Sequence, residues 1–437
     1  MKEIRLGICG LGTVGGGVLD LIKRNADRLY DQVGAPVRVV KIGSRTKKPL
    51  FNDEEISFYQ DVLLLAEDPD IDIVLELIGG VDIAKELVRK AIINGKHVVT
   101  ANKALIASHG EELFSLAQRY SVSLRFEAAV AGSIPIVKIL RESLSSNKIS
   151  CVTGIINGTT NYILSEMAVS DRSFSDILSE AQELGFAEAD PTFDIEGIDA
   201  GHKLVILASL AFGIPLSLDE LSIEGISQIS IADLKSASEL GYGIKHLAVA
   251  RLVNERLELS VHLALISATH LITRVDGAGN AILIQGDPSG ETLLCGAGAG
   301  AGPTASSVVS DVIDLARNLI REQADQVKHL GFSMTAIKPR ELLTQDEIVA
   351  PWYLRIEAED NSKSIAAITD ILIKRDISKQ TIVSKIIDAS SNKIEIVIIT
   401  DPSSTKALFD ATEEISRLQS VSGAITKIRI EDLPSCT

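Results

Sequence analysis

One stretch of the sequence, residues 184–204, gathers several carboxylates and one lysine and then enters an apolar helix pattern. Asp199 and Lys203 stand four residues apart there, and the apolar pattern continues through KLVILASL. At that spacing the two side chains share one face of a helix and can touch. Glu188 lies earlier, on a predicted loop, where it can reach the charged end of a small ligand. The pattern predicts a site for a charged substrate, and an ordinary helical ion pair is the alternative.

A glycine-rich turn near the N-terminus predicts a dinucleotide-binding site. The stretch IRLGICGLGTVGGGVLDLI has the G-x-G-x-x-G spacing between an apolar strand pattern and an amphipathic helix pattern. In this motif the glycines permit a tight turn, the approach of a pyrophosphate, and close packing of helix on strand. A glycine-rich turn without a ligand is the alternative. The candidate cofactor ligands in the turn are Gly10, Leu11, Gly12, Thr13, Val14 and Gly15.

The following segments alternate between strand and helix patterns, as a doubly wound parallel sheet requires. Strands are predicted over residues 37–43, 71–78 and 96–100, and helices over 82–94 and 103–120. Ligands of such folds bind on the loops at the carboxyl ends of the strands. Further cofactor-binding candidates on these loops are Arg45, Gly79, Thr100 and Lys103, together with Gly298 on a later glycine-rich loop.

The end of the second predicted strand indicates which dinucleotide binds. An acidic side chain at this position would contact the ribose of NAD, but the sequence has the cations Arg45, Lys47 and Lys48 instead. Because cations suit a ribose phosphate, we expect NADP(H) to be preferred over NAD(H). A solvated basic loop without a ligand is the alternative.

Composition disfavours several classes of protein. The chain has 437 residues and a net charge of −16, which argues against nucleic acid or an anionic membrane as a partner because both require a basic face. The 4 cysteines lack the spacing of a zinc site or a disulfide framework. The first residues enter a strand pattern directly, without a signal sequence, so we expect a cytoplasmic protein that acts on a small polar substrate.

Several longer strings match a known family in order and separation. They are GLGTVG, TANKAL, EAAVAGSIPI, GIINGTTNYIL, GFAEADPTFDIEGIDAGHK, VDGAGNAILIQGD and GAGAGAGPTASSVV. Over residues 1–325 the chain resembles the homoserine dehydrogenases. The resemblance implies oxidation of L-homoserine to L-aspartate 4-semialdehyde with NAD(P)+, or the reverse, in threonine and methionine biosynthesis.

The resemblance also implies a role for each matching residue. It makes Lys203 the proton-transferring group, Asp199 a substrate-site carboxylate, Glu188 the ligand of the substrate ammonium, and Lys103 a second active-site lysine beside the nicotinamide. It further implies a structural monovalent cation, usually sodium, coordinated mainly by backbone oxygens. The positions that match this cation site are Glu127, Val130, Gly132 and Ile134.

The C-terminal region alternates as strand, helix, strand, strand, helix, strand, which predicts a ferredoxin-like module. It resembles the ACT domains, which bind amino acids at dimer interfaces, and in this family that suggests feedback by threonine. The first strand-to-helix turn, Asp360-Asn361-Ser362-Lys363, lacks the glycine that lets a ligand approach the backbone. A plain dimerisation module is therefore the alternative.

The length and these patterns predict three domains in an α/β chain. Residues 1–145 and 303–325 are expected to form a Rossmann-type domain, residues 146–302 an inserted α+β substrate-binding and dimerisation domain, and residues 350–437 the ACT-like domain. Exposed sheet edges make a homodimer or homotetramer the expected assembly. Two rival functions are a catalytically inactive sensor of nucleotide and amino acid, and another NADP-linked semialdehyde reductase.

Overall fold

The computed structural model describes residues 3–46, 54–219, 221–323, 325–360, 362–388 and 392–433. The chain forms two compact units, each assembled from three segments. The first consists of Met1–Val152, Ala200–Asp219 and Gly279–Arg340, and the second of Thr153–Asp199, Glu220–Ala278 and Glu341–Thr437. The expected division into three domains stays a prediction beside this division into two units.

A parallel sheet forms the centre of the first unit, with its strands in the order β3-β2-β1-β4-β5-β6. Its middle strands, IRLGIC and IVLE, are buried along nearly their whole length because helices cover both faces of the sheet. The strands are β1 (Ile4–Cys9), β2 (Val37–Gly43), β3 (Ser57–Tyr59), β4 (Ile73–Glu76), β5 (His97–Thr100) and β6 (Leu124–Arg125).

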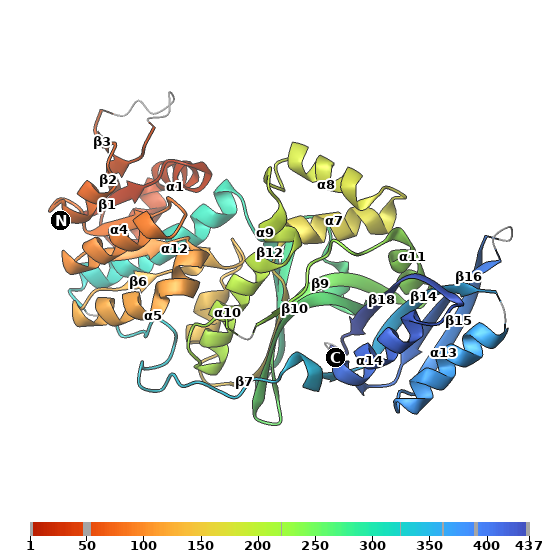
Figure 1. The fold of residues 1–437 in the computed structure, drawn as a ribbon. Coiled ribbons are helices and arrows are strands. Elements are labelled where there is room, and N and C mark those ends of the chain that lie inside the picture. Colours follow the sequence, from red (N-terminus) through yellow and green to blue (C-terminus); the bar gives the residue numbers. More distant parts are fainter. Residues whose placement is uncertain are drawn as a thin grey trace. The chain divides into compact units, whose positions relative to one another are not determined.

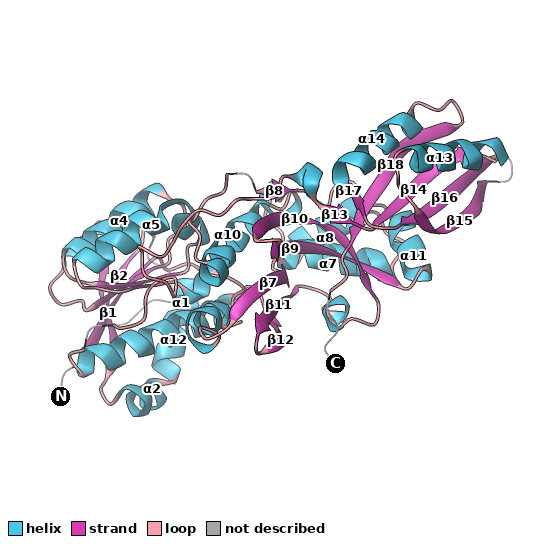
Figure 2. Ribbon diagram, turned by 90° about the horizontal axis from the view of Figure 1, so that it is seen from below, coloured by secondary structure: helices cyan, strands magenta, loops and turns pink. Residues whose placement is uncertain are grey.

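Helices on both faces make the sheet doubly wound, as the sequence predicts. Helices α1 (Thr13–Arg24), α2 (Ala26–Val33) and α12 (Ala301–Ile320) cover one face, and α4 (Asp82–Ile93) and α5 (Lys103–Arg119) cover the other (Figures 1 and 2). Apolar residues of α1, α2 and α12 pack against β1 in one core. The smaller elements of this unit are α3 (Leu63–Glu67), η1 (Glu127–Ala129), α6 (Ile136–Lys138), η2 (Ile139–Ser143), and a hairpin of β11 (Gly279–Asp287) and β12 (Gly290–Ala297).

Helices and a long hairpin form the middle of the second unit. Strands β9 (Tyr242–Val253) and β10 (Arg256–Ser267) pair antiparallel along their whole length. Their turn is tight because both of its residues, Asn254 and Glu255, have positive φ angles. The other elements are α7 (Gly158–Val169), α8 (Phe174–Glu183), α9 (Thr192–Ile195), β8 (Ser222–Ile223), α11 (Ile231–Glu239) and η3 (Leu271–Arg274). Along the chain, β7 (Lys148–Ile155) and α10 (Ile198–Phe212) each contain a boundary between the two units.

The C-terminal module has the predicted ferredoxin-like topology, with strands in the antiparallel order β18-β14-β16-β15. Helices α13 and α14 cover one face of this sheet (Figure 2). On the other face, Tyr353, Val397 and Ile428 share a core with residues of α7, α8 and α11, so the module is part of the second unit. The elements are η4 (Gln345–Glu347), β13 (Val349–Ala350), β14 (Trp352–Glu359), α13 (Ser362–Lys374), β15 (Lys379–Asp388), β16 (Lys393–Thr400), β17 (Ser403–Ser404), α14 (Thr405–Ser416) and β18 (Val421–Ile430).

Candidate active site

The glycine turn between β1 and α1 is shaped for backbone contact with a phosphate. Gly10 has a φ of +102°, and a Cβ there would lie 2.4 Å from the carbonyl oxygen of Leu77. A Cβ on Gly15 would lie 1.9 Å from the carbonyl oxygen of Gly10, so both positions require glycine. At Gly12, by contrast, no described atom comes within 4 Å of the Cβ position. The N–H groups that begin α1 therefore border an open cradle of the kind that receives an anion.

A chain of buried hydrogen bonds fixes the loops at the carboxyl edge of the same sheet. Glu76 ends β4 and is fully buried, and its carboxylate accepts hydrogen bonds from the Thr100 hydroxyl and from the N–H of Ile78, the latter at 3.0 Å. Thr100 Oγ1 in turn accepts a hydrogen bond from the N–H of Asn102 at 3.0 Å. Burial raises the pKa of the Glu76 carboxyl. These bonds hold the loop after β4 and the loop after β5 in one arrangement.

Asn102 completes that arrangement and sets the start of α5. Its Oδ1 caps the helix by accepting the N–H of Leu105 at 3.1 Å, and its Nδ2 donates to the carbonyl oxygen of Gly80 at 2.6 Å. Lys103 is the first residue of α5 and is half-buried. The predicted cofactor residues Gly79, Thr100 and Lys103 thus lie on two loops tied to each other.

Thr100 was predicted from the sequence as a site residue, whereas Glu76 was not. A carboxylate inside the apolar run IVLELIGG was the available signal, because a buried acid requires hydrogen-bond donors. Arg45 lies just after the carboxyl end of β2 and is exposed. Lys47 and Lys48 lie outside the described residues.

The loop after β12 leaves no space for a side chain at Gly298. A Cβ on Gly298 would come within 2.2 Å of the Asn280 side chain, which is almost fully buried. Gly132, with a φ of +54°, faces the same loop, and a Cβ there would lie 2.6 Å from the carbonyl oxygen of Ala297. Ser133 donates to that oxygen from its backbone N–H at 3.0 Å. The predicted cofactor loop and the turn predicted to bind a cation are therefore in direct contact.

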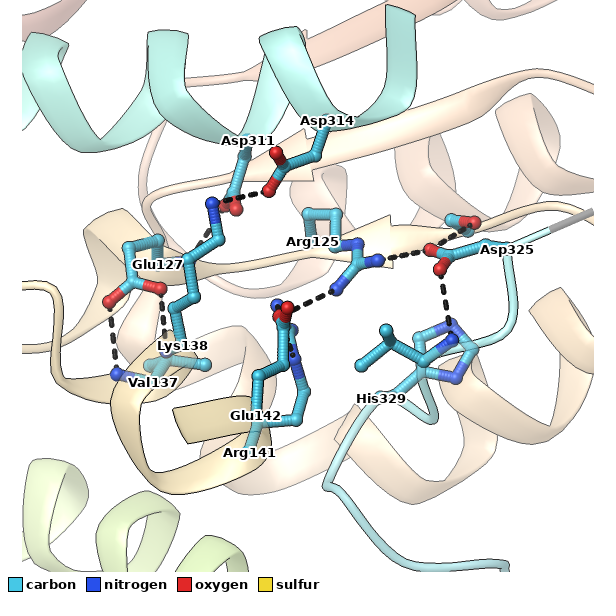
Figure 3. Close-up of polar contacts among 12 residues, drawn as sticks. Arg125, Glu127, Val137, Lys138, Arg141, Glu142, Asp311, Asp314, Asp325 and His329 are labelled. Carbon is cyan, nitrogen blue, oxygen red and sulfur yellow. Dashed lines mark hydrogen bonds and ion pairs between the residues drawn. The ribbon is translucent and has the colours of Figure 1, made fainter. Parts of the chain in front are cut away.

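The predicted cation ligands lie on a buried turn. Glu127 on this turn also caps the start of a helix (Figure 3). The Glu127 carboxylate accepts the N–H groups of Val137 at 2.9 Å and Lys138 at 2.8 Å. Burial and the nearby Asp311 raise the pKa of Glu127. The carbonyl oxygen of Gly132 accepts the Ser307 hydroxyl at 2.6 Å. Among the described residues no group of three His, Cys, Asp or Glu side chains is placed to hold a metal, so a cation here would depend on backbone oxygens such as those of Val130 and Ile134.

The two candidate residues on α10 have the spacing predicted from the sequence. Asp199 and Lys203 lie one turn apart on α10, where Asp199 is buried and Lys203 half-buried. The residues that follow, among them Leu204 and Leu207, are buried, as the apolar helix pattern predicts. A single rigid element therefore presents the acid and the ammonium group on one face.

In the second unit, the side chain of Asn157 holds Asp199. Its Nδ2 donates to the Asp199 carboxylate at 2.9 Å and to the Asp194 carboxylate at 2.8 Å. Its Oδ1 accepts the N–H of Thr160 at 2.8 Å and so caps α7. The polar string 157–161 therefore supplies both a helix cap and hydrogen bonds to carboxylates of other segments.

Glu188 lies between α8 and α9 and is exposed. Its carbonyl oxygen accepts a hydrogen bond from Gln182 Nε2 at 3.0 Å, which ties the segment to the end of α8. Glu188 and Asp199 belong to the second unit, whereas Lys203, Lys103, the glycine turn and Gly298 belong to the first.

Comparison with known proteins covers nearly the whole chain. Residues 135–313 match the model of the homoserine dehydrogenase family, and residues 10–127 match its NAD-binding domain. A homoserine dehydrogenase of Pseudomonas aeruginosa is 47% identical over 433 residues, which is 99% of this chain and 100% of the relative. A crystal structure of a homoserine dehydrogenase from Thiobacillus denitrificans has a TM-score of 0.92 at 46% identity and covers 99% of both chains.

A more distant solved structure is a hyperthermophilic archaeal homoserine dehydrogenase in complex with NADPH. It is 27% identical with a TM-score of 0.62, and the match covers 72% of this chain and 98% of that one. None of the helices in the described part of the chain has the length and hydropathy needed to span a bilayer.

Proposed function

The chain belongs to the homoserine dehydrogenase family, and from this premise we propose that it interconverts L-homoserine and L-aspartate 4-semialdehyde with NADP(H) in preference to NAD(H). As a member of the family it is an NAD(P)-dependent oxidoreductase that acts on a CH–OH group. We place the reaction in threonine and methionine biosynthesis. The observation that carries the proposal is the acid and ammonium pair on α10, Asp199 and Lys203, in a chain that also has the glycine cradle at α1.

The described residues fit a dinucleotide. The open cradle at Gly12 leaves room for a pyrophosphate against the first N–H groups of α1. Arg45, exposed after β2, supplies a cation for a ribose phosphate, and this supports the preference for NADP(H). The solved archaeal relative in complex with NADPH supports the same choice. When bound, the nicotinamide ring supplies or accepts the hydride.

The protein's own residues transfer the proton and bind the charged groups of the substrate. In reduction the Lys203 ammonium donates a proton to the aldehyde oxygen as negative charge develops there, and in oxidation its amine takes the proton from the hydroxyl. Asp199, one turn earlier on the same helix, orients Lys203. Glu188 binds the α-ammonium group of the substrate, and Lys103 adds positive charge beside the nicotinamide site.

An assay of purified protein tests this function. With L-homoserine, absorbance at 340 nm should rise faster with NADP+ than with NAD+. The K203A variant should lose turnover and keep its affinity for NADP+ in calorimetry, whereas K406A, at an exposed lysine on α14, should match the wild type. Turnover by K203A near the wild-type rate would refute its role. Tight binding of both ligands without turnover would favour the sensor, and faster turnover of another alcohol would favour a different reductase.

Three further assignments complete the proposal. A monovalent cation binds at the turn of Glu127, Val130, Gly132 and Ile134, and replacing sodium by choline should then lower the melting temperature. The enzyme is cytoplasmic. It forms a homodimer or a homotetramer, and light scattering of the purified protein would show which of the two is present. Threonine binds the ACT-like module and lowers activity. The turn at residues 360–363 that bears on threonine binding includes Asn361, which lies outside the described residues.

A further inference from the structure

One side-chain amide, that of Asn157, links two acidic side chains of the second unit. Its Nδ2 donates to Asp199 Oδ2 at 2.9 Å and to Asp194 Oδ1 at 2.8 Å. Asn157 and Asp199 are both 4% exposed, so this bond is shielded from water. Hydrogen bonds from a neutral donor to a carboxylate are among the stronger ones in proteins, and burial strengthens them further.

The same helix end holds the segment that carries Glu188. Thr159 Oγ1 lies 2.7 Å from the carbonyl oxygen of Phe186 and 3.1 Å from Asp194 Oδ2. Phe186 and Asp194 lie on either side of Glu188 in the sequence. The first turn of α7 therefore contacts the segment before and after Glu188 and also contacts Asp199.

The type of residue at position 157 suits this task. An amide supplies two N–H groups without adding charge, so it can lie between two carboxylates whose mutual repulsion it offsets. Capping α7 requires only the Oδ1 atom, a task that serine, threonine or aspartate could also perform. The donor end of the amide is therefore surplus to capping, and both of its bonds go to acids.

We propose that Asn157 is a positioning residue for the substrate site. It orients the Asp199 carboxylate directly and orders the segment of Glu188 through Asp194, while Thr159 provides the second attachment. The inference rests on the proposed function, because it gives Asp199 and Glu188 their roles toward L-homoserine. Asn157 itself is not assigned to contact with the substrate.

Two variants separate positioning from capping. N157S keeps an oxygen that can cap α7 but cannot donate to both carboxylates. We expect its KM for L-homoserine to rise by about 10- to 100-fold, with little change in its affinity for NADP+ and only a small fall in its melting temperature. N157D keeps the size and the cap but adds a third acid to the cluster. It should regain affinity for L-homoserine as the pH is lowered from 8 to 6, because protonation of the cluster restores one donor.

A matched control is S404A, which removes the cap of α14 in the C-terminal module. It should lower stability by a similar small amount without changing the KM for L-homoserine. An unchanged KM in N157S, or a pH profile of N157D that matches the wild type, would overturn the positioning role. If N157S does not fold, N157D decides the question alone. Absence of L-homoserine turnover in the wild type would instead overturn the proposed function, and the positioning role with it.

Discussion

A single methyl group, added at two different positions of the glycine turn, tests whether the cradle at α1 receives the cofactor. In G15A the new Cβ would lie 1.9 Å from the carbonyl oxygen of Gly10, where ordinary contact begins at 3.4 Å. The turn and the helix must therefore separate by about 1.5 Å, and overpacking of this kind costs about 1–3 kcal/mol of folding free energy. Gly10 has little freedom to yield, because its N–H donates to the carbonyl oxygen of Gly43 at 2.7 Å.

The G12A variant should behave in the opposite way. No described atom lies within 4 Å of the new Cβ, so the fold is not strained, and the change at the start of α1 costs only about 0.5 kcal/mol. The methyl group does, however, occupy the space through which a pyrophosphate approaches the backbone. We expect the affinity for NADP+ to fall by at least about tenfold, which corresponds to about 1.4 kcal/mol.

Thermal unfolding of the cofactor-free variants and calorimetric titration with NADP+ measure the two effects separately. G15A should melt about 2–12 °C below the wild type, as expected for a loss of about 1–3 kcal/mol in a unit of this size. G12A should melt within about 2 °C of the wild type and bind NADP+ weakly. If G12A bound NADP+ as tightly as the wild type, the location of the cradle would be wrong. An unchanged melting temperature for G15A would contradict the close approach of turn and helix.

Other predictions concern stability and the loop contacts. R355M should lose about 3–5 kcal/mol in urea unfolding, because it leaves the fully buried Asp233 without its arginine, whereas R417M, at an exposed ion pair, should lose less than about 0.5 kcal/mol. Burial lowers the pKa of His329 to about 4, so the unfolded chain binds the extra proton below about pH 6.5. Stability should therefore fall as the pH drops from about 6.5 to 4, and H329Q should flatten that slope; an unchanged slope would contradict this. G132A should lower both the melting temperature and the affinity for NADP+, because the residue has a φ of +54° and faces the predicted cofactor loop; a variant equal to the wild type would refute this contact.

Much of the fold was predictable because periodicity is a local property. The strand predicted over residues 37–43 is β2, and the helices predicted over 82–94 and 103–120 are α4 and α5 to within one residue at their ends. The strand predicted over 71–78 is shorter in the structure, Ile73–Glu76, because the chain turns at Gly79 and Gly80 with positive φ angles. An apolar pattern alone does not show where pairing with the neighbouring strands stops.

The sequence by itself determined the glycine turn, the four-residue spacing of Asp199 and Lys203, and the order of strands and helices, because backbone sterics and side-chain periodicity act between near neighbours. Tertiary structure alone decided which distant groups meet. Glu76 and Thr100 are 24 residues apart in the chain, and Asn157 and Asp199 are 42 apart, yet each pair is joined by a buried hydrogen bond. Such bonds depend on the path of the whole chain, which places donors and acceptors together only after the cores have packed.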